Sequence, residues 1–162
     1  MVKPGYQAIL NENIPVVPLP LGSSKEDSIA TARIIAGELG DTKGAAKTHS
    51  PVQLWDVNLP NKGSVVDLPF PADHNCIVFV RRGSVEVVGE KSTTLGPQEV
   101  AIMALDGSDT LRLNVQQKNS SVLILGGEPL NEPIAARGPF VMNTPAEIQQ
   151  AIKDYQMGKM GR

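Results

Sequence analysis

Short apolar runs rich in β-branched residues recur along most of the chain, and in several of them apolar and polar residues alternate. Clusters of Gly, Pro, Asp, Asn and Ser separate one run from the next. A period of two is typical of β-strands, and strands repeating every 8–12 residues or so are typical of antiparallel sandwiches and barrels. The predicted strands are residues 31–40 (ending at Gly37 or at Gly40), 51–59, 63–70, 76–90 (a hairpin around Arg82–Gly83–Ser84), 99–105, 110–116 and 121–126.

The N-terminal part of the chain does not follow this rhythm. Pro15, Pro18 and Pro20 exclude a helix and a central strand, because proline lacks a backbone N–H and has a fixed φ. A polar stretch, "SKEDSIA", follows them. We therefore expect residues 1–30 to form an extended arm and a loop.

One helix is predicted, in the stretch "NTPAEIQQAIKDYQMG". Its apolar residues recur every three to four positions, which places them on one helix face. Its first residues match an N-cap, a proline at the first helical position and a capping box, and a glycine ends it. The residues are Ile148, Ala151, Ile152 and Tyr155 on the apolar face, Thr144, Pro145 and Glu147 at the start, and Gly158 at the end.

Before this helix lies "GGEPLNEPIAARGPFVMNT", which reads as an irregular segment because of its Gly and Pro content. It nevertheless contains Leu130, Ile134, Phe140 and Met142, which usually seek burial. We expect a strap that these side chains anchor. The predicted organisation is one domain: arm and loop at 1–30, barrel at 31–126, and at 127–162 the strap and helix packed on the barrel.

Composition narrows the class of protein. The chain has 162 residues, 41% of them hydrophobic but only 4% aromatic, which predicts one globular domain with an aliphatic core. A net charge of −2 provides no basic surface for nucleic acid. The single Cys excludes internal disulfides and fits a reducing compartment, so we expect a cytoplasmic location, or a nuclear one in a eukaryote. The sequence shows no leader and no apolar run of about 18 residues, so no membrane partner is expected.

Candidate chemistry is sparse. His49 and His74 each precede a predicted strand, in no metal-ligand spacing, which favours surface or capping roles over a two-His site completed by Asp73 or Glu90. Cys76 would share a strand face with His74, yet it begins an apolar run, which favours a small core residue over a reactive thiol. The sequence contains no nucleophile elbow, phosphate loop or dinucleotide fingerprint.

The C-terminal segment "GGEPLNEPIAARGPFVMNT" with its following helix closely resembles the end of the pirin family. "GYQAILNENIP", "RIIAGELGDTKG", "SPVQLWDVNLP" and "HNCIVFVRRGSVEV" are similar to earlier parts of the same family's second half. Pirins are bicupins, two barrels joined face to face, and the resemblance covers only the second barrel. It implies an all-β fold: one cupin-like antiparallel barrel (a double-stranded β-helix or jelly roll) with an extended N-terminal arm and one C-terminal α-helix.

The resemblance also bears on metals. The family's iron, held by three His and a Glu, belongs to the first barrel, so no cofactor is expected in this chain. When the glycine that ends the first metal-binding cupin motif is aligned with Gly83, Phe70, Ala72 and Cys76 fall near the ligand positions. Thr110 falls near the final His of the second cupin motif. We therefore expect a metal-free barrel without catalytic residues. Four residues remain candidates at the barrel mouth: His74, Cys76, Trp55 and Thr110.

The predicted function is a non-catalytic pirin-type module that acts in protein–protein interaction or as a structural or regulatory partner. Self-association is expected, as a homodimer that replaces the missing first cupin. One alternative is a piece of an iron-dependent quercetin 2,3-dioxygenase whose catalytic first cupin lies outside this chain. A second is a metal-free cupin that binds a small molecule in a cavity lined by Trp55, Phe79, Met103 and Leu113, although these residues would more simply fill the core.

Overall fold

The computed structural model describes residues 7–20, 29–105 and 107–159. The chain divides into two compact units. The larger, Ile9–Pro129, is called the β-domain below, and the smaller, called the C-terminal unit, comprises Leu130–Arg162 together with Met1–Ala8.

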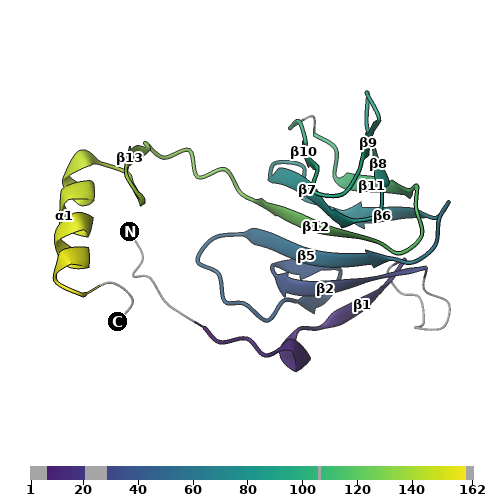
Figure 1. The fold of residues 1–162 in the computed structure, drawn as a ribbon, viewed down its shortest axis with the longest axis horizontal. Coiled ribbons are helices and arrows are strands. Elements are labelled where there is room, and N and C mark those ends of the chain that lie inside the picture. Colours follow the sequence, from purple (N-terminus) through teal and green to yellow (C-terminus); the bar gives the residue numbers. More distant parts are fainter. Residues whose placement is uncertain (1–6, 21–28, 106, 160–162) are drawn as a thin grey trace. The chain divides into compact units, whose positions relative to one another are not determined.

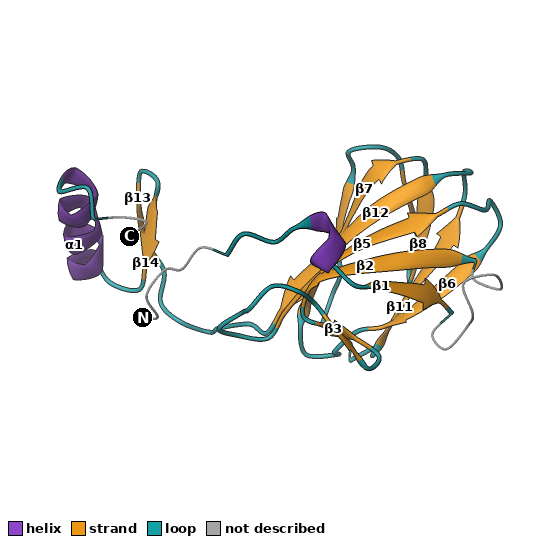
Figure 2. Ribbon diagram, turned by 90° about the horizontal axis from the view of Figure 1, so that it is seen from below, coloured by secondary structure: helices purple, strands orange, loops and turns teal. Residues whose placement is uncertain are grey.

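The β-domain consists of two antiparallel sheets packed over a common core (Figures 1 and 2). The six-stranded sheet has the order β1 (Val16–Leu19), β2 (Ala30–Ala36), β5 (Val52–Leu59), β12 (Ser120–Gly127), β7 (Asn75–Arg82), β10 (Val100–Ile102). The four-stranded sheet has the order β6 (Val65–Pro69), β11 (Thr110–Val115), β8 (Val85–Val88), β9 (Thr93–Leu95). A small hairpin, β3 (Glu38–Leu39) with β4 (Thr42–Lys43), and a 3-10 turn, Asn11–Asn13, complete the β-domain. This arrangement confirms the predicted all-β, jelly-roll class.

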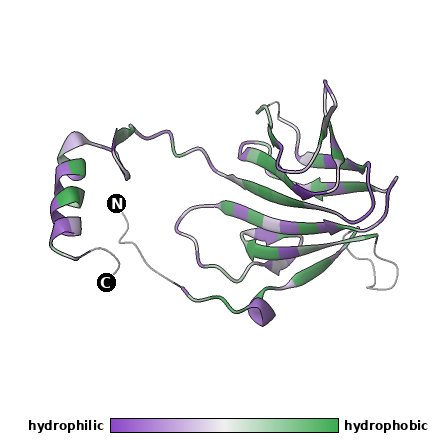
Figure 3. Ribbon diagram, viewed as in Figure 1, coloured by the Kyte–Doolittle hydropathy of each residue, from purple (hydrophilic) through white to green (hydrophobic). Residues whose placement is uncertain are grey.

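The predicted alternation explains how the strands build the core. Along β2 and β7 every second residue is buried, and hydrophobic residues lie along the strands of both sheets (Figure 3). The core is aliphatic, as the composition predicts, and Trp55 is the largest fully buried side chain. Others that are completely buried are Leu19, Ile34, Val57, Leu59, Leu68, Val78, Val80, Val85, Leu113 and Ile124.

The predicted arm and the first predicted strand differ in detail from the structure. The first strand, predicted to end at Gly37 or at Gly40, ends at Ala36, because Gly37 has a φ of +77° and turns the chain into β3. Within the predicted arm, residues 16–19 form β1, and Pro18 is tolerated there because β1 lies at the edge of its sheet. The polar loop at 21–28 lies outside the described residues.

The predicted hairpin within residues 76–90 is wrong. β7 pairs with β12 and β10, whereas β8 pairs with β11 and β9 in the other sheet. The turn at Gly83 therefore carries the chain from one sheet to the other. Both strands present apolar side chains to the same core, so the sequence pattern of a hairpin and that of a crossing between sheets are alike.

The C-terminal unit contains a short hairpin and the predicted helix. The strap segment, predicted to be irregular, forms β13 (Ala135–Arg137) paired with β14 (Phe140–Met142). Helix α1 (Pro145–Gln156) begins with the predicted capping box, in which the Thr144 side chain and Glu147 bond each other's backbone N–H. No helix in the described part of the chain is long and apolar enough to cross a membrane.

Within this unit the helix packs through Ile148 and Ala151, which are buried, and Tyr155 meets Phe140 edge to face at 5.9 Å. Leu130 and Ile134 are exposed, and Tyr155 is exposed over most of its surface despite this contact. The prediction that residues 127–162 pack on the barrel stays a prediction.

Candidate functional site

A cavity of about 90 Å³ opens at one end of the β-domain, where β7 and β11 begin and β6 and β10 end. We call it the mouth cavity. It is lined by Phe70, Pro71, Ala72, His74, Cys76, Val88, Gly89, Met103, Ala104, Ser108, Thr110 and Leu111.

His74 lies in the turn before β7 and lines this cavity. It is buried, with 9% of its surface exposed. Its backbone N–H donates to the carbonyl oxygen of Pro71, at 3.1 Å, which fixes the turn. Its Nδ1 atom is buried and has no hydrogen-bond partner among the described residues. Such atoms are rare in folded proteins, where most buried polar groups are paired.

Cys76 follows on the same side of β7 and is 6% exposed. Burial raises the pKa of its thiol to about 12, so the thiol is protonated at neutral pH. A protonated, buried thiol is a poor nucleophile, which agrees with the expectation of a small core residue. Met103 lies opposite Cys76, because its backbone N–H donates to the Cys76 carbonyl oxygen at 2.9 Å.

The structure brings together three of the four predicted candidates at the barrel mouth. His74, Cys76 and Thr110 line the same cavity. Trp55 does not: its side chain is 1% exposed and contacts Phe70 edge to face, with ring centroids 5.5 Å apart. Trp55 therefore supports the wall of the cavity from within the core.

The residues predicted to line a small-molecule cavity likewise do not all lie at the mouth cavity. Met103 lines the mouth cavity, whereas Leu113 is completely buried in the core. Phe79 alternates with the core residues Val78 and Val80 along β7, so its side chain faces away from the core.

The mouth cavity does not fit the iron set of three imidazoles and a carboxylate. Among the part of its lining that the structure describes, His74 is the single imidazole and there is no carboxylate. His49 is exposed in the loop before β5, and Glu90 borders a neighbouring depression. Four residues were expected to fall near the ligand positions of metal-binding cupins, and all four line this cavity: Phe70, Ala72, Cys76 and Thr110.

A second feature lies on the opposite side of the six-stranded sheet, where the side chains point away from the core. We call the apolar surface formed there the outer face. Its residues are Leu54, Ile77, Phe79, Val100, Ile102, Leu123 and Leu125. The strand register places Ile102 beside Ile77, and Ile77 beside Leu125. Val100 is 51% and Ile102 77% exposed, and the other five residues are partly exposed.

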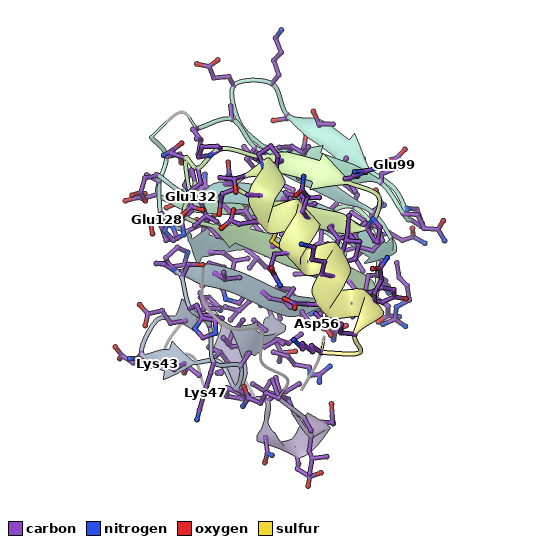
Figure 4. The ribbon with its side chains drawn as sticks, turned by 90° about the vertical axis from the view of Figure 1, so that its left-hand side faces the viewer. Lys43, Lys47, Asp56, Glu99, Glu128 and Glu132 are labelled. Atoms are coloured by element: carbon purple, nitrogen blue, oxygen red, sulfur yellow. The ribbon has the colours of Figure 1, made fainter. Side chains whose placement is uncertain are left out.

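A charged cluster borders the outer face. Asp56 of β5, labelled in Figure 4, is only 8% exposed and pairs with Arg33 of β2 and Arg81 of β7. Its carboxylate accepts from Arg33 Nη1 at 3.2 Å and from Arg81 Nη2 at 2.5 Å. Arg81 also donates to Ser121 Oγ through Nε and Nη2, at 3.1 and 2.7 Å, and Arg33 donates to Asn11 Oδ1 at 2.5 Å.

Comparison with known proteins decides the family. Residues 54–161 match the Pirin C-terminal cupin domain. The chain belongs to the pirin family. Human pirin is 31% identical over 99% of this chain, and a pirin-like protein of Solanum lycopersicum is 32% identical over 99%.

The pirin relatives also include proteins named as dioxygenases. A crystal structure of quercetin 2,3-dioxygenase from Acinetobacter baumannii superimposes on 96% of this chain with a TM-score of 0.81 and 41% identity. The chain spans about half of each relative: 52% of the human and tomato proteins and 50% of the Acinetobacter chain.

Two features of these sites were not predicted from the sequence: the position of Met103 opposite Cys76, and the outer face. Met103 was expected only as a hydrophobic lining residue, and its position opposite Cys76 depends on how β10 pairs with β7. The outer face was also missed. Its signal was present in the alternation itself, because β7 and β12 carry apolar residues at the positions between the core residues.

Proposed function

We propose that this pirin C-terminal cupin domain acts by binding rather than by catalysis, and that its outer face binds a second copy of the chain. The observation that carries the proposal is the exposure of Val100 and Ile102 beside partly exposed Ile77 and Phe79. Contiguous exposed apolar surface on a protein marks an interaction site.

The geometry of the outer face favours another β-sheet as its partner. Two sheets pack face to face about 10 Å apart by interdigitating apolar side chains, and a stable interface buries roughly 800 Å² per partner. Human pirin carries about as much chain again outside the matched part, since the match covers 52% of it. A second copy of this chain offers a surface of the same size and shape, and a two-fold pairing brings one outer face against the other.

The charged cluster suits the rim of such an interface. The Arg33 and Arg81 side chains are 35% and 40% exposed, so they can stay in contact with water while the apolar residues are covered. The mouth cavity supports a non-catalytic role through the protonated Cys76 thiol. A reducing location, cytoplasmic or in a eukaryote nuclear, is part of the same proposal.

The variant Ile102→Glu tests the outer face. We expect the wild-type chain to sediment as a dimer at micromolar concentration and the variant to shift to monomer, because a buried carboxylate at the interface is strongly unfavourable. Val65→Glu is the matched control, since Val65 is 50% exposed on β6 of the other sheet. It should leave the dimer intact.

A monomeric wild-type chain at high concentration would contradict the proposal, as would equal effects of the two variants. If residues 127–162 instead cover the outer face of their own β-domain, the wild type is monomeric and Ile102→Glu lowers its melting temperature. Sedimentation equilibrium together with thermal unfolding separates these outcomes.

A second candidate function is that of one half of a quercetin 2,3-dioxygenase. The 41% identity to the Acinetobacter protein of that name, over half of its length, favours it. We expect no quercetin consumption by this chain alone. A chimera joining the remaining half of the Acinetobacter protein to this chain should consume quercetin, measured by loss of its absorbance.

Turnover by the isolated chain would overturn the non-catalytic proposal. A folded but inactive chimera would count against the second candidate. The Acinetobacter protein itself, assayed alongside, provides the positive control.

A further inference from the structure

Three side chains with nitrogen or sulfur donors line the mouth cavity: His74, Cys76 and Met103. Residues directly opposite on antiparallel strands have Cβ atoms about 4.5–5.5 Å apart, so the backbone hydrogen bond from Met103 to Cys76 brings these two side chains together. His74 precedes Cys76 by two residues, which places it on the same side of the strand. Two separate segments of the chain thus bring a thiol, a thioether and an imidazole to one small space.

One of these groups lacks a partner. The His74 side chain is nine-tenths buried, and its Nδ1 has no hydrogen-bond partner among residues 7–20, 29–105 and 107–159. Leaving a buried polar atom unpaired costs about 1–3 kcal/mol. A ligand in the cavity would remove that cost if the imidazole turned to present Nδ1 to it.

The donors indicate which ligand this is. Ca²⁺ and Mg²⁺ prefer oxygen, and no carboxylate is among the described residues that line the cavity. Cysteine and methionine sulfur select soft ions, Cu(I) above all, and imidazole is also a good copper ligand. Low-coordinate Cu(I) needs only two or three donors, which is what the cavity offers.

We propose that the mouth cavity is a site for a soft metal ion of the Cu(I) class, held by Cys76, Met103 and His74. The cavity, about 90 Å³, is larger than a metal ion and leaves room for the three side chains to turn toward it. This site is independent of the proposed dimer, since it lies on the core side of the sheet. The sequence led to the expectation of a barrel without any metal. The Cu(I) titration described next tests that expectation against this proposal.

The purified full chain should be titrated anaerobically with Cu(I) in competition with a coloured chelator such as bicinchoninate. We expect one Cu(I) per chain. Cys76→Ser should abolish this binding, because it removes the one donor that binds as an anion, after Cu(I) has displaced the thiol proton to solvent. Met103→Leu and His74→Gln should each weaken the affinity by ~10-fold or more, as expected for the loss of one ligand.

Two matched controls replace the same residue types away from the cavity. His49 is exposed, and Met157 is 54% exposed in the C-terminal unit. His49→Gln and Met157→Leu should bind Cu(I) as the wild type does.

X-ray absorption at the copper edge of the loaded wild-type protein should show sulfur ligands. The proposal is overturned if the wild type retains no Cu(I) against the chelator, or if a folded Cys76→Ser variant binds as tightly as wild type. A copper environment without sulfur overturns it as well, and that result does not depend on how well any variant folds.

Discussion

Replacing Asp56 by alanine is expected to lower the free energy of unfolding by about 2 kcal/mol, because its buried carboxylate accepts charge-assisted hydrogen bonds from two arginines. Asp56 is 8% exposed and bonds both Arg33 and Arg81. Without its carboxylate two guanidinium groups remain close together beside the apolar outer face, and Arg81 keeps only its bonds to Ser121. Urea unfolding at a fixed protein concentration gives the change.

Asp67→Ala is the matched control. Asp67 also pairs with an arginine across strands, through two bonds of 2.7 Å to Arg112, but its side chain is 46% exposed. Arg112 holds the pKa of the Asp67 carboxyl below its usual value, yet water screens a pair at this exposure. The control should lose a small fraction of what Asp56→Ala loses. Equal losses would show that burial of the Asp56 cluster does not determine its contribution.

Features encoded by neighbouring residues were predictable from the sequence. The start of α1 depends on Thr144, Pro145 and Glu147, and all three act within one turn of the chain. Strands such as β2, β5 and β7 were found because each one carries its own alternation, whereas β1, β13 and β14 lie in segments predicted to be extended or irregular. The class of fold follows from these local signals, together with the lack of other helical patterns.

Features that depend on pairing between distant strands were not predictable. Nothing in residues 76–90 distinguishes a hairpin from a crossing, because the difference lies in the partners β11 and β12. The same holds for the mouth cavity. His74 and Cys76 are neighbours in sequence and were singled out together, whereas Met103 joins them only through the register of β10 on β7.

Trp55 illustrates a related limit. Alternation along residues 51–59 places it on a face shared with Val57 and Leu59, but it cannot say whether that face is core or cavity wall. The structure places it in the core, against Phe70. Whether an inward side chain reaches a cavity depends on the residues across from it, which come from other strands.

An added methyl group at Gly83, where the chain crosses between sheets, is expected to be strongly damaging. It has a φ of +72°, and a Cβ atom built there would lie 2.7 Å from the Cα of Ser120 and 2.2 Å from its Oγ. Ser120 cannot easily move, because it is completely buried and its Oγ accepts from the Ser84 N–H at 3.0 Å. Gly83→Ala is therefore expected to cost about 3 kcal/mol or more, from left-handed strain and overpacking together.

Gly63→Ala separates the two contributions. Gly63 has a similar φ of +83°, but no atom lies within 4 Å of the position its Cβ would take. Its replacement should cost only the strain, about 1–2 kcal/mol. Denaturant unfolding of both variants measures the difference, which reports the contact between the crossing turn and Ser120. If the two variants lose the same free energy, the turn is held by backbone conformation alone, and the close approach to Ser120 does not stabilise the crossing between the sheets.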